Sequence, residues 1–86
     1  AEVAVLGACG LDADFGLSSD EPLESSVKRA MAAAAERALV VTGAGKLGQR
    51  ARHRTLVPAE IDAIVTDAGP ERTAPFTTAG IEVVHG

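Results

Sequence analysis

The residues with the clearest chemical potential follow the apolar stretch Leu39–Thr42. Gly43, Gly45 and Gly48 have the Gly-x-Gly-x-x-Gly spacing, and Lys46 stands between the last two glycines. Glycines at this spacing let a backbone approach a pyrophosphate when a strand precedes them and a helix begins at their end. One hypothesis is therefore a dinucleotide-binding turn for NAD or NADP, in a fragment of an enzyme.

The segment after these glycines is a poor helix. It reads QRARHRTLV, and only Ala51 precedes Leu56 on any apolar stripe that could cover a sheet. A lone Gly-x-Gly-x-x-Gly is a weak signal, and the P-loop pattern fails because Leu47 occupies the position of its magnesium-binding Ser or Thr. The alternative is that the glycines only turn the chain and that Lys46 is solvated.

Charged side chains gather on two loops. Half of the eight Lys and Arg lie between residues 46 and 54, and acidic residues concentrate between residues 12 and 24. Basic and acidic loops that both follow strands are consistent with a site for a polyhydroxy anion at the carboxyl ends of the strands. The net charge of −4 and the pI near 5.0 argue against nucleic-acid binding by this segment itself.

The composition limits the other classes. The 86 residues, of which 47% are hydrophobic, allow one domain or a piece of one. The single cysteine, Cys9, rules out an internal disulfide and supplies no metal cluster, so we expect no metal and no cofactor. We find no signal peptide and no apolar run of transmembrane length, which favours a cytoplasmic protein without membrane contact. The absence of an initial Met suggests that an N-terminal part is missing.

Apolar and helical segments alternate along the chain, which predicts an α/β fold with mostly parallel strands. The strands are near-continuous apolar runs, typical of burial on both faces of a sheet. The stretch GACGLDADFGLS predicts a loop because it holds several glycines and aspartates and has no helical period. The expected strands are Glu2–Leu6, Leu39–Thr42, Ile61–Thr66 and Ile81–Val84, and a weak helix is expected over Pro70–Ala79, capped by Gly80.

A stronger helix is predicted from the residues that follow Asp20. Ser18, Ser19 and Asp20 offer capping oxygens, and Pro22 fits the first turn. Apolar side chains recur at helical spacing on one face, which we expect to contact the core, and charged side chains lie on the other. The apolar positions are Leu23, Val27, Ala30, Met31, Ala34 and Ala38.

Four linked blocks then carry a resemblance to a known family. They are GACGLDADFGL, ESSVKRAM, KLG and IDAIVTD, in this order. Together they resemble the C-terminal sensor domain of DeoR-type bacterial transcription repressors, over Glu2 to Val84. The resemblance implies a three-layer, Rossmann-like fold similar to ribose-5-phosphate isomerase and the CoA transferases, with helices flanking the sheet. Residues 1–86 would be its C-terminal part, and the first half of the sensor domain and an N-terminal winged helix-turn-helix would be absent.

The resemblance also implies a function. A domain of this family is expected to sense a phosphorylated sugar or related metabolite, to form homo-oligomers, and to affect DNA only through the missing domain, without catalysis. An isomerase-like enzyme for sugar phosphates remains an alternative, because the implied fold also hosts isomerases. The residues expected to bind the effector are Gly10, Asp12, Glu24, Lys28 and Lys46.

Simpler interpretations exist for several of these residues. Lys28 lies one helical turn after Glu24, so the two could form an ordinary surface ion pair. Asp12 could recognise a sugar hydroxyl or cap an Asx-turn, and Asp67 is better interpreted as a turn acceptor. The family pattern has Asp and Ser where this chain has Gly43 and Gly45, so two substitutions account for the apparent dinucleotide signature.

Overall fold

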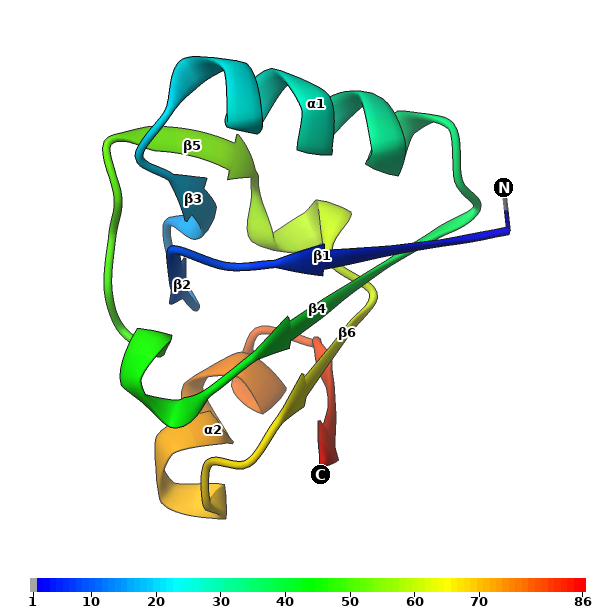
Figure 1. Ribbon diagram of the computed structural model, residues 1–86. Coiled ribbons are helices and arrows are strands. Elements are labelled where there is room, and N and C mark those ends of the chain that lie inside the picture. The colour runs from blue at the N-terminus through cyan, green and yellow to red at the C-terminus, as the bar shows by residue number, and fades with distance from the viewer. Residues whose placement is uncertain (1) are drawn as a thin grey trace.

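The structure is a computed structural model that describes residues 2–86. Strands and helices alternate along the chain, as expected for an α/β domain (Figure 1). The strands are β1 (Val3–Gly7), β2 (Gly10–Asp12), β3 (Gly16–Ser19), β4 (Arg37–Thr42), β5 (His53–Leu56), β6 (Ala63–Thr66) and β7 (Glu82–His85). The helices are α1 (Pro22–Ala33), α2 (Pro70–Thr78) and the short 3-10 turns η1 (Ala44–Lys46) and η2 (Pro58–Glu60).

The larger sheet has four parallel strands in the order β1-β4-β6-β7. Val5 pairs with Leu39 and Leu39 pairs with Ala63, so these neighbouring strands run in register. The parallel arrangement confirms the predicted mostly parallel α/β class. It also brings the carboxyl ends of β1, β4 and β6 to the same edge of the sheet (Figure 1).

A second, antiparallel sheet of three strands has the order β2-β3-β5. The prediction of a loop over GACGLDADFGLS is therefore wrong, because this stretch contains β2 and β3. These strands are short and depend on β5, a partner far along the chain, so local periodicity does not reveal them. Gly16 is the first residue of β3, has a φ of 95°, and leaves no room for a Cβ beside the carbonyl of Leu56. Glycine is the residue that tolerates both conditions.

Helix α1 begins at Pro22, as predicted, but it ends at Ala33, so Ala38 belongs to β4 instead of the helix. Its N-cap is Glu21, without a side-chain hydrogen bond. Ser18 and Ser19 do not cap it, because both are buried in β3. Helix α2 matches the expected Pro70–Ala79 segment within one residue, and Gly80 follows with a φ of 90°.

The orientation of α1 differs from the prediction. Its apolar stripe faces solvent, and Leu23 is 76% exposed. The side facing the protein carries Ser25, whose hydroxyl lies 2.9 Å from that of Thr55. Thr55 Oγ1 lies 3.1 Å from the hydroxyl of Ser19, and Arg29 donates to the Thr55 carbonyl at 2.7 Å. Hydrogen bonds to buried groups therefore attach α1 to the antiparallel sheet, and Ala32, which is not on the expected stripe, packs against the hydrophobic core.

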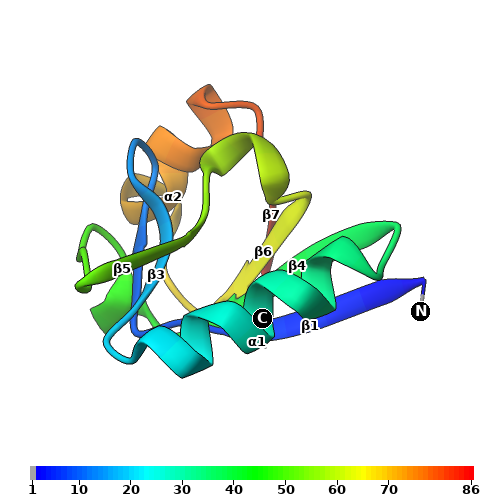
Figure 2. The same cartoon turned by 90° about the horizontal axis from the view of Figure 1, so that it is seen from above.

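The core lies between one face of the parallel sheet and a layer formed by the antiparallel sheet and α2 (Figure 2). Leu6, Val40 and Ile64 of the parallel sheet are buried there with Leu17 and Phe76. This layer covers only one face of the parallel sheet, so burial on both faces was a wrong expectation for the described residues.

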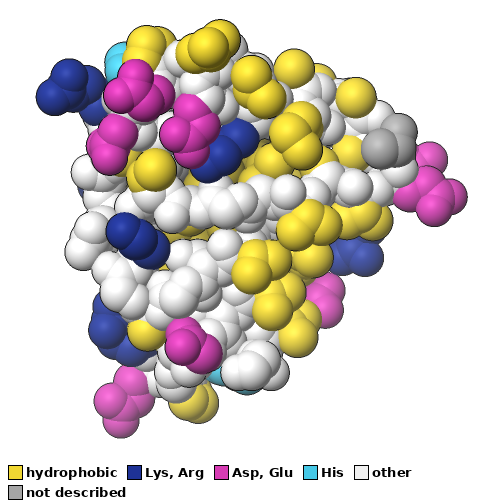
Figure 3. All heavy atoms as spheres, viewed as in Figure 1, with side chains coloured by type: hydrophobic (Ala, Val, Ile, Leu, Met, Phe, Trp, Pro, Cys, Tyr) yellow, Lys and Arg dark blue, Asp and Glu magenta, His cyan; other side chains and the backbone are white. Residues whose placement is uncertain are grey.

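The opposite face of the parallel sheet leaves apolar side chains in solvent. Its exposed members are Val3, Val5, Val41 and Val84. Figure 3 shows hydrophobic side chains gathered over β1 and β4 and, in a second band, along α1. We call these four valines the open valine face.

Candidate functional site

Two of the predicted effector residues, Lys28 and Lys46, lie on segments at the carboxyl edge of the parallel sheet. Gly7 ends β1 and pairs with Val41, so the segments that leave β1 and β4 start side by side. The segment after β4 forms the turn η1 with Lys46, and Asp67 follows directly after β6. Gly7 and Gly45 border open space, since a Cβ added at either would meet no atom within 4 Å. This edge thus offers room beside a basic turn.

Lys28 of α1 is fixed at the end of β1. Its Nζ donates to the Gly7 carbonyl at 2.8 Å and forms an ion pair with Glu24 Oε1, also at 2.8 Å. The Lys28 side chain is only 13% exposed. The two residues are therefore more than a surface pair, because the ammonium is held against the backbone of another element. An ammonium has three donors, so these contacts leave one for a ligand.

The carboxylate of Glu24 is poised as an anion. The hydrogen bond and the charge of Lys28 lower its pKa from the usual value, against a smaller opposing effect of burial. The thiol of Cys9 adds a weak contact, with Sγ 3.9 Å from Glu24 Oε1. Glu24 can accept a further hydrogen bond, such as one from a hydroxyl group.

Lys46 lies on the turn η1 and is exposed. No hydrogen bond or ion pair of its side chain occurs within residues 2–86. The turn itself is well anchored. Asp67 Oδ1 accepts the N–H of Ala44 at 3.0 Å, so Asp67 is an acceptor for the turn η1 and does not cap α2, whose N-cap is Gly69. Arg72 of α2 donates to the carbonyls of Ala44 and Leu47, at 3.0 and 3.2 Å.

Gly10 and Asp12 lie on β2, and the structure gives both a local role. A Cβ at Gly10 would lie 2.7 Å from the Gln49 carbonyl oxygen, so glycine permits this close approach of two segments. Asp12 Oδ2 accepts the N–H groups of Asp14 and Phe15 at 3.0 and 2.7 Å, which is the Asx-turn geometry. Recognition of an effector by Gly10 or Asp12 stays a prediction.

The pKa of Asp12 is lowered overall. Burial is the largest single influence and would raise it, but the hydrogen bonds from Phe15 and Asp14 and the guanidinium of Arg50 together outweigh burial. Arg50 Nη2 lies 3.1 Å from Asp12 Oδ2. The carboxylate is therefore an anion with several partners inside the protein.

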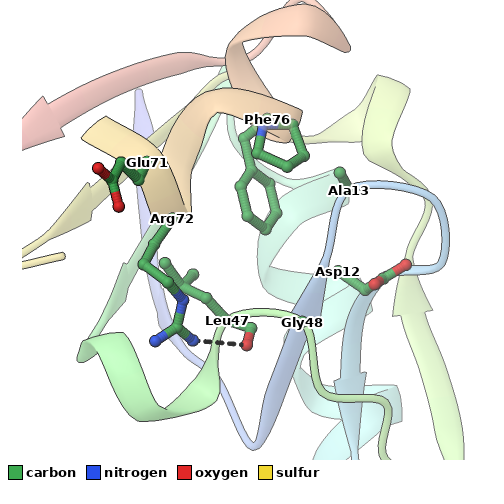
Figure 4. Close-up of a pocket in the computed structure, with 8 residues that line it drawn as sticks. Asp12, Ala13, Leu47, Gly48, Glu71, Arg72 and Phe76 are labelled. Carbon is green, nitrogen blue, oxygen red and sulfur yellow. Dashed lines mark hydrogen bonds between the residues drawn. The ribbon is translucent and has the colours of Figure 1, made fainter. Parts of the chain in front are cut away.

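Asp12 contributes to a pocket of about 270 Å³ between α2 and the loop after η1 (Figure 4). The pocket is lined by Asp12, Ala13, Leu47, Gly48, Glu71, Arg72, Pro75 and Phe76. Figure 4 shows the Asp12 carboxylate directed away from Arg72 and Phe76, while the Arg72 guanidinium extends toward the Leu47 carbonyl.

The predicted effector residues therefore do not share one pocket. Glu24 and Lys28 line a shallow groove along α1, Asp12 belongs to the pocket beside α2, and Lys46 lines neither. Sequence reasoning missed Arg72, because nothing in the pattern of α2 indicates which loop that helix will contact.

The glycine loop lacks the structure of a dinucleotide-binding turn. After Gly48 the described chain continues through an irregular segment into β5, and no helix starts there. Without a helix, no N-terminus faces the loop to bind a pyrophosphate. Within residues 2–86 no group of three or more His, Cys, Asp or Glu could hold a metal ion. None of the helices in that range is long and apolar enough to cross a membrane.

The architecture and the loops together define a class of protein. The chain matches the family model of the DeoR C-terminal sensor domain over residues 1–68. It therefore belongs to that family, as the four sequence blocks predicted. Membership makes the chain part of a sensor domain and not of an enzyme, which sets aside the NAD, NADP and isomerase hypotheses.

A curated relative extends the match to nearly the whole chain. The chain is 29% identical over 85 residues to a protein of Escherichia coli O157:H7 named "Putative aga operon transcriptional repressor". The similarity covers 96% of this chain and 32% of the relative. The chain thus spans about a third of the length of the curated relative it matches.

Proposed function

We propose that this chain is the effector-binding part of a DeoR-type bacterial transcriptional repressor. Membership in the sensor-domain family and similarity to a protein named as a repressor support this proposal. In the full-length protein, an N-terminal winged helix-turn-helix binds DNA in the cytoplasm. Binding of the effector to this part changes the affinity of that domain for DNA.

The proposed effector is a phosphorylated sugar or a related metabolite, bound at the carboxyl edge of the parallel sheet. The observation that carries this proposal is the Lys28 ammonium, fixed on the Gly7 carbonyl beside open space. A second cation, Lys46, stands on the neighbouring turn and makes no side-chain contact that competes for it within residues 2–86. Cations suit a phosphate group, and the Glu24 carboxylate can accept a sugar hydroxyl.

The proposal includes assembly into a homo-oligomer. The open valine face and the apolar stripe of α1 support it, because contiguous exposed apolar surface is a common mark of protein–protein contact. Oligomerisation also suits a repressor, because symmetric dimers match operators with two half-sites.

The proposed ligand class can be tested by NMR titration of the chain. Phosphorylated hexoses and pentoses are compared with the same sugars without phosphate, and the amide signals of Gly7, Lys28 and Lys46 are followed. We expect saturable shifts at these amides only with phosphorylated sugars. Equal responses to the free sugars, or shifts confined to other parts of the chain, would argue against the proposal.

A further inference from the structure

The turn η1, which carries Lys46, is intrinsically weak. It comprises only three residues, Ala44–Lys46, in a 3-10 conformation. Such turns have poorer hydrogen-bond geometry than an α-helix. Gly43 and Gly45 add conformational freedom that must be lost when the turn forms. The position of Lys46 therefore depends on contacts from outside the turn.

Arg72 supplies such contacts at both ends of the turn. A single guanidinium nitrogen, Nη2, donates to the Ala44 carbonyl at 3.0 Å and to the Leu47 carbonyl at 3.2 Å. Figure 4 shows the second of these contacts. Ala44 is the first residue of η1 and Leu47 is its C-cap. The same Ala44 carbonyl accepts the Leu47 N–H at 3.2 Å, so Arg72 shares the acceptor of the bond that closes the turn and also contacts the carbonyl of Leu47.

Two other hydrogen bonds attach the turn and the residue that follows it to the rest of the protein. Asp67 accepts the Ala44 N–H, and the Gly48 N–H donates to the Leu11 carbonyl at 2.7 Å. Arg72 differs from these because it joins the two ends of the turn to each other and to α2. It also lies beyond residue 68, where the match to the sensor-domain family ends.

We propose that Arg72 is a positioning residue that holds the Lys46 turn in the geometry needed to bind the phosphate of the effector. This inference rests on the proposed function, since it concerns the same site. Arg72 contacts the carbonyls of Ala44 and Leu47. Its effect on phosphate binding therefore comes from holding the turn in one conformation and not from its charge alone.

The first test measures order without any ligand. Amide hydrogen exchange of Leu47 is compared in the wild-type chain, Arg72→Ala and the control Arg52→Ala, which removes an equal charge from an exposed position. We expect about tenfold faster exchange of Leu47 in Arg72→Ala, because the charge-assisted contact that bridges the two ends of the turn is lost and the turn opens more often. Exchange of Ser25, on α1, should not change in either variant. Unchanged Leu47 exchange in Arg72→Ala overturns the positioning role.

The second test measures binding of inorganic phosphate by the chemical shift of the Lys46 amide, at low and at high salt. We expect Arg72→Ala to bind phosphate about fivefold to tenfold more weakly at both salt concentrations, since salt screens a distant charge but does not restore a lost hydrogen bond. Arg52→Ala should weaken binding slightly, and only at low salt. A defect of Arg72→Ala that disappears at high salt would overturn the inference in favour of a purely electrostatic effect.

Arg72→Lys separates charge from position. Lysine keeps the positive charge but lacks the planar fork of arginine. Full phosphate affinity in this variant, combined with fast Leu47 exchange, would again show that charge alone matters and would overturn the inference. If the wild-type chain binds no phosphate while Arg72→Ala still loosens the turn, the proposed function fails and the hold of Arg72 on the turn is supported.

Discussion

At the scale of single residues, the structure gives the predicted effector residues different roles. Lys28 and Glu24 form an ion pair whose ammonium also contacts the backbone of β1, whereas Asp12 caps a turn within the antiparallel sheet. The pair follows from the i, i+4 spacing in the sequence, but its contact with Gly7 does not. Arg72 could not be predicted for the site, because only the tertiary structure places α2 against the Lys46 turn.

The lowered pKa of Asp12 leads to a prediction about how the stability of the fold depends on pH. Its pKa is lower in the folded protein than the usual value of 3.8, so its contribution to stability is complete above that pH. The contribution is lost as the pH falls through the lower, folded pKa. We expect Asp12→Asn to unfold about 1 kcal/mol more easily at neutral pH, because the charge-assisted hydrogen bonds are weakened.

The measurement is urea unfolding of the wild type and Asp12→Asn from neutral pH downward. Asp14→Asn is the matched control, since the Asp14 side chain is largely exposed and lies 3.5 Å from Arg50. The difference between Asp12→Asn and the wild type should shrink in acid. A difference that is constant with pH, or that matches that of Asp14→Asn, would contradict the assigned role of Asp12.

At the scale of elements, local signals predicted the ends of helices better than their orientation. Pro22 and Gly80 mark the start of one helix and the end of the other, and both agree with the structure, whereas the end of α1 was placed too late in the sequence. The strands β2 and β3 were missed because they are stabilised by β5, which lies far away in sequence. The apolar stripe of α1 was assigned to the core because periodicity identifies a face but not what it contacts.

The attachment of α1 through hydroxyl groups leads to a stability prediction. Thr55 Oγ1 links the hydroxyls of Ser19 and Ser25, and all three residues are buried. We expect Thr55→Val to lower the free energy of unfolding by about 1–3 kcal/mol, because it leaves buried hydroxyls without this partner. Thr77→Val, at an exposed position of α2, should change stability little. Equal stability of the two variants in urea unfolding would show that the hydroxyl network does not hold α1.

At the scale of the whole molecule, one face of the parallel sheet, the open valine face, is exposed. The sequence pattern and the family resemblance predicted the α/β class and the four strands of the parallel sheet. They did not predict which face of the parallel sheet would be exposed. That depends on which of the alternating side chains of β1 and β4 point toward the core. A sheet face of this kind favours association with another apolar surface.

We therefore expect the chain to self-associate in a concentration-dependent way. Val5 is 55% exposed and Val41 lies on the same face, so Val5→Ser combined with Val41→Ser should shift the equilibrium toward the monomer. Ala74→Ser, on the exposed side of α2, is the matched control and should leave the equilibrium unchanged. Light scattering over a range of concentrations gives the mass, and a strictly monomeric wild type at high concentration would contradict this expectation.

In the proposed site, Lys28 and Lys46 bind the phosphate of the effector at the carboxyl edge of the parallel sheet. The most direct measurement is calorimetric titration of the wild type, Lys28→Ala, Lys46→Ala and the control Arg52→Ala with the phosphorylated sugar that binds most tightly. The account predicts about tenfold or greater loss of affinity in each lysine variant, with a folded far-UV spectrum and little effect of the control. Unchanged affinity in both lysine variants would contradict the account.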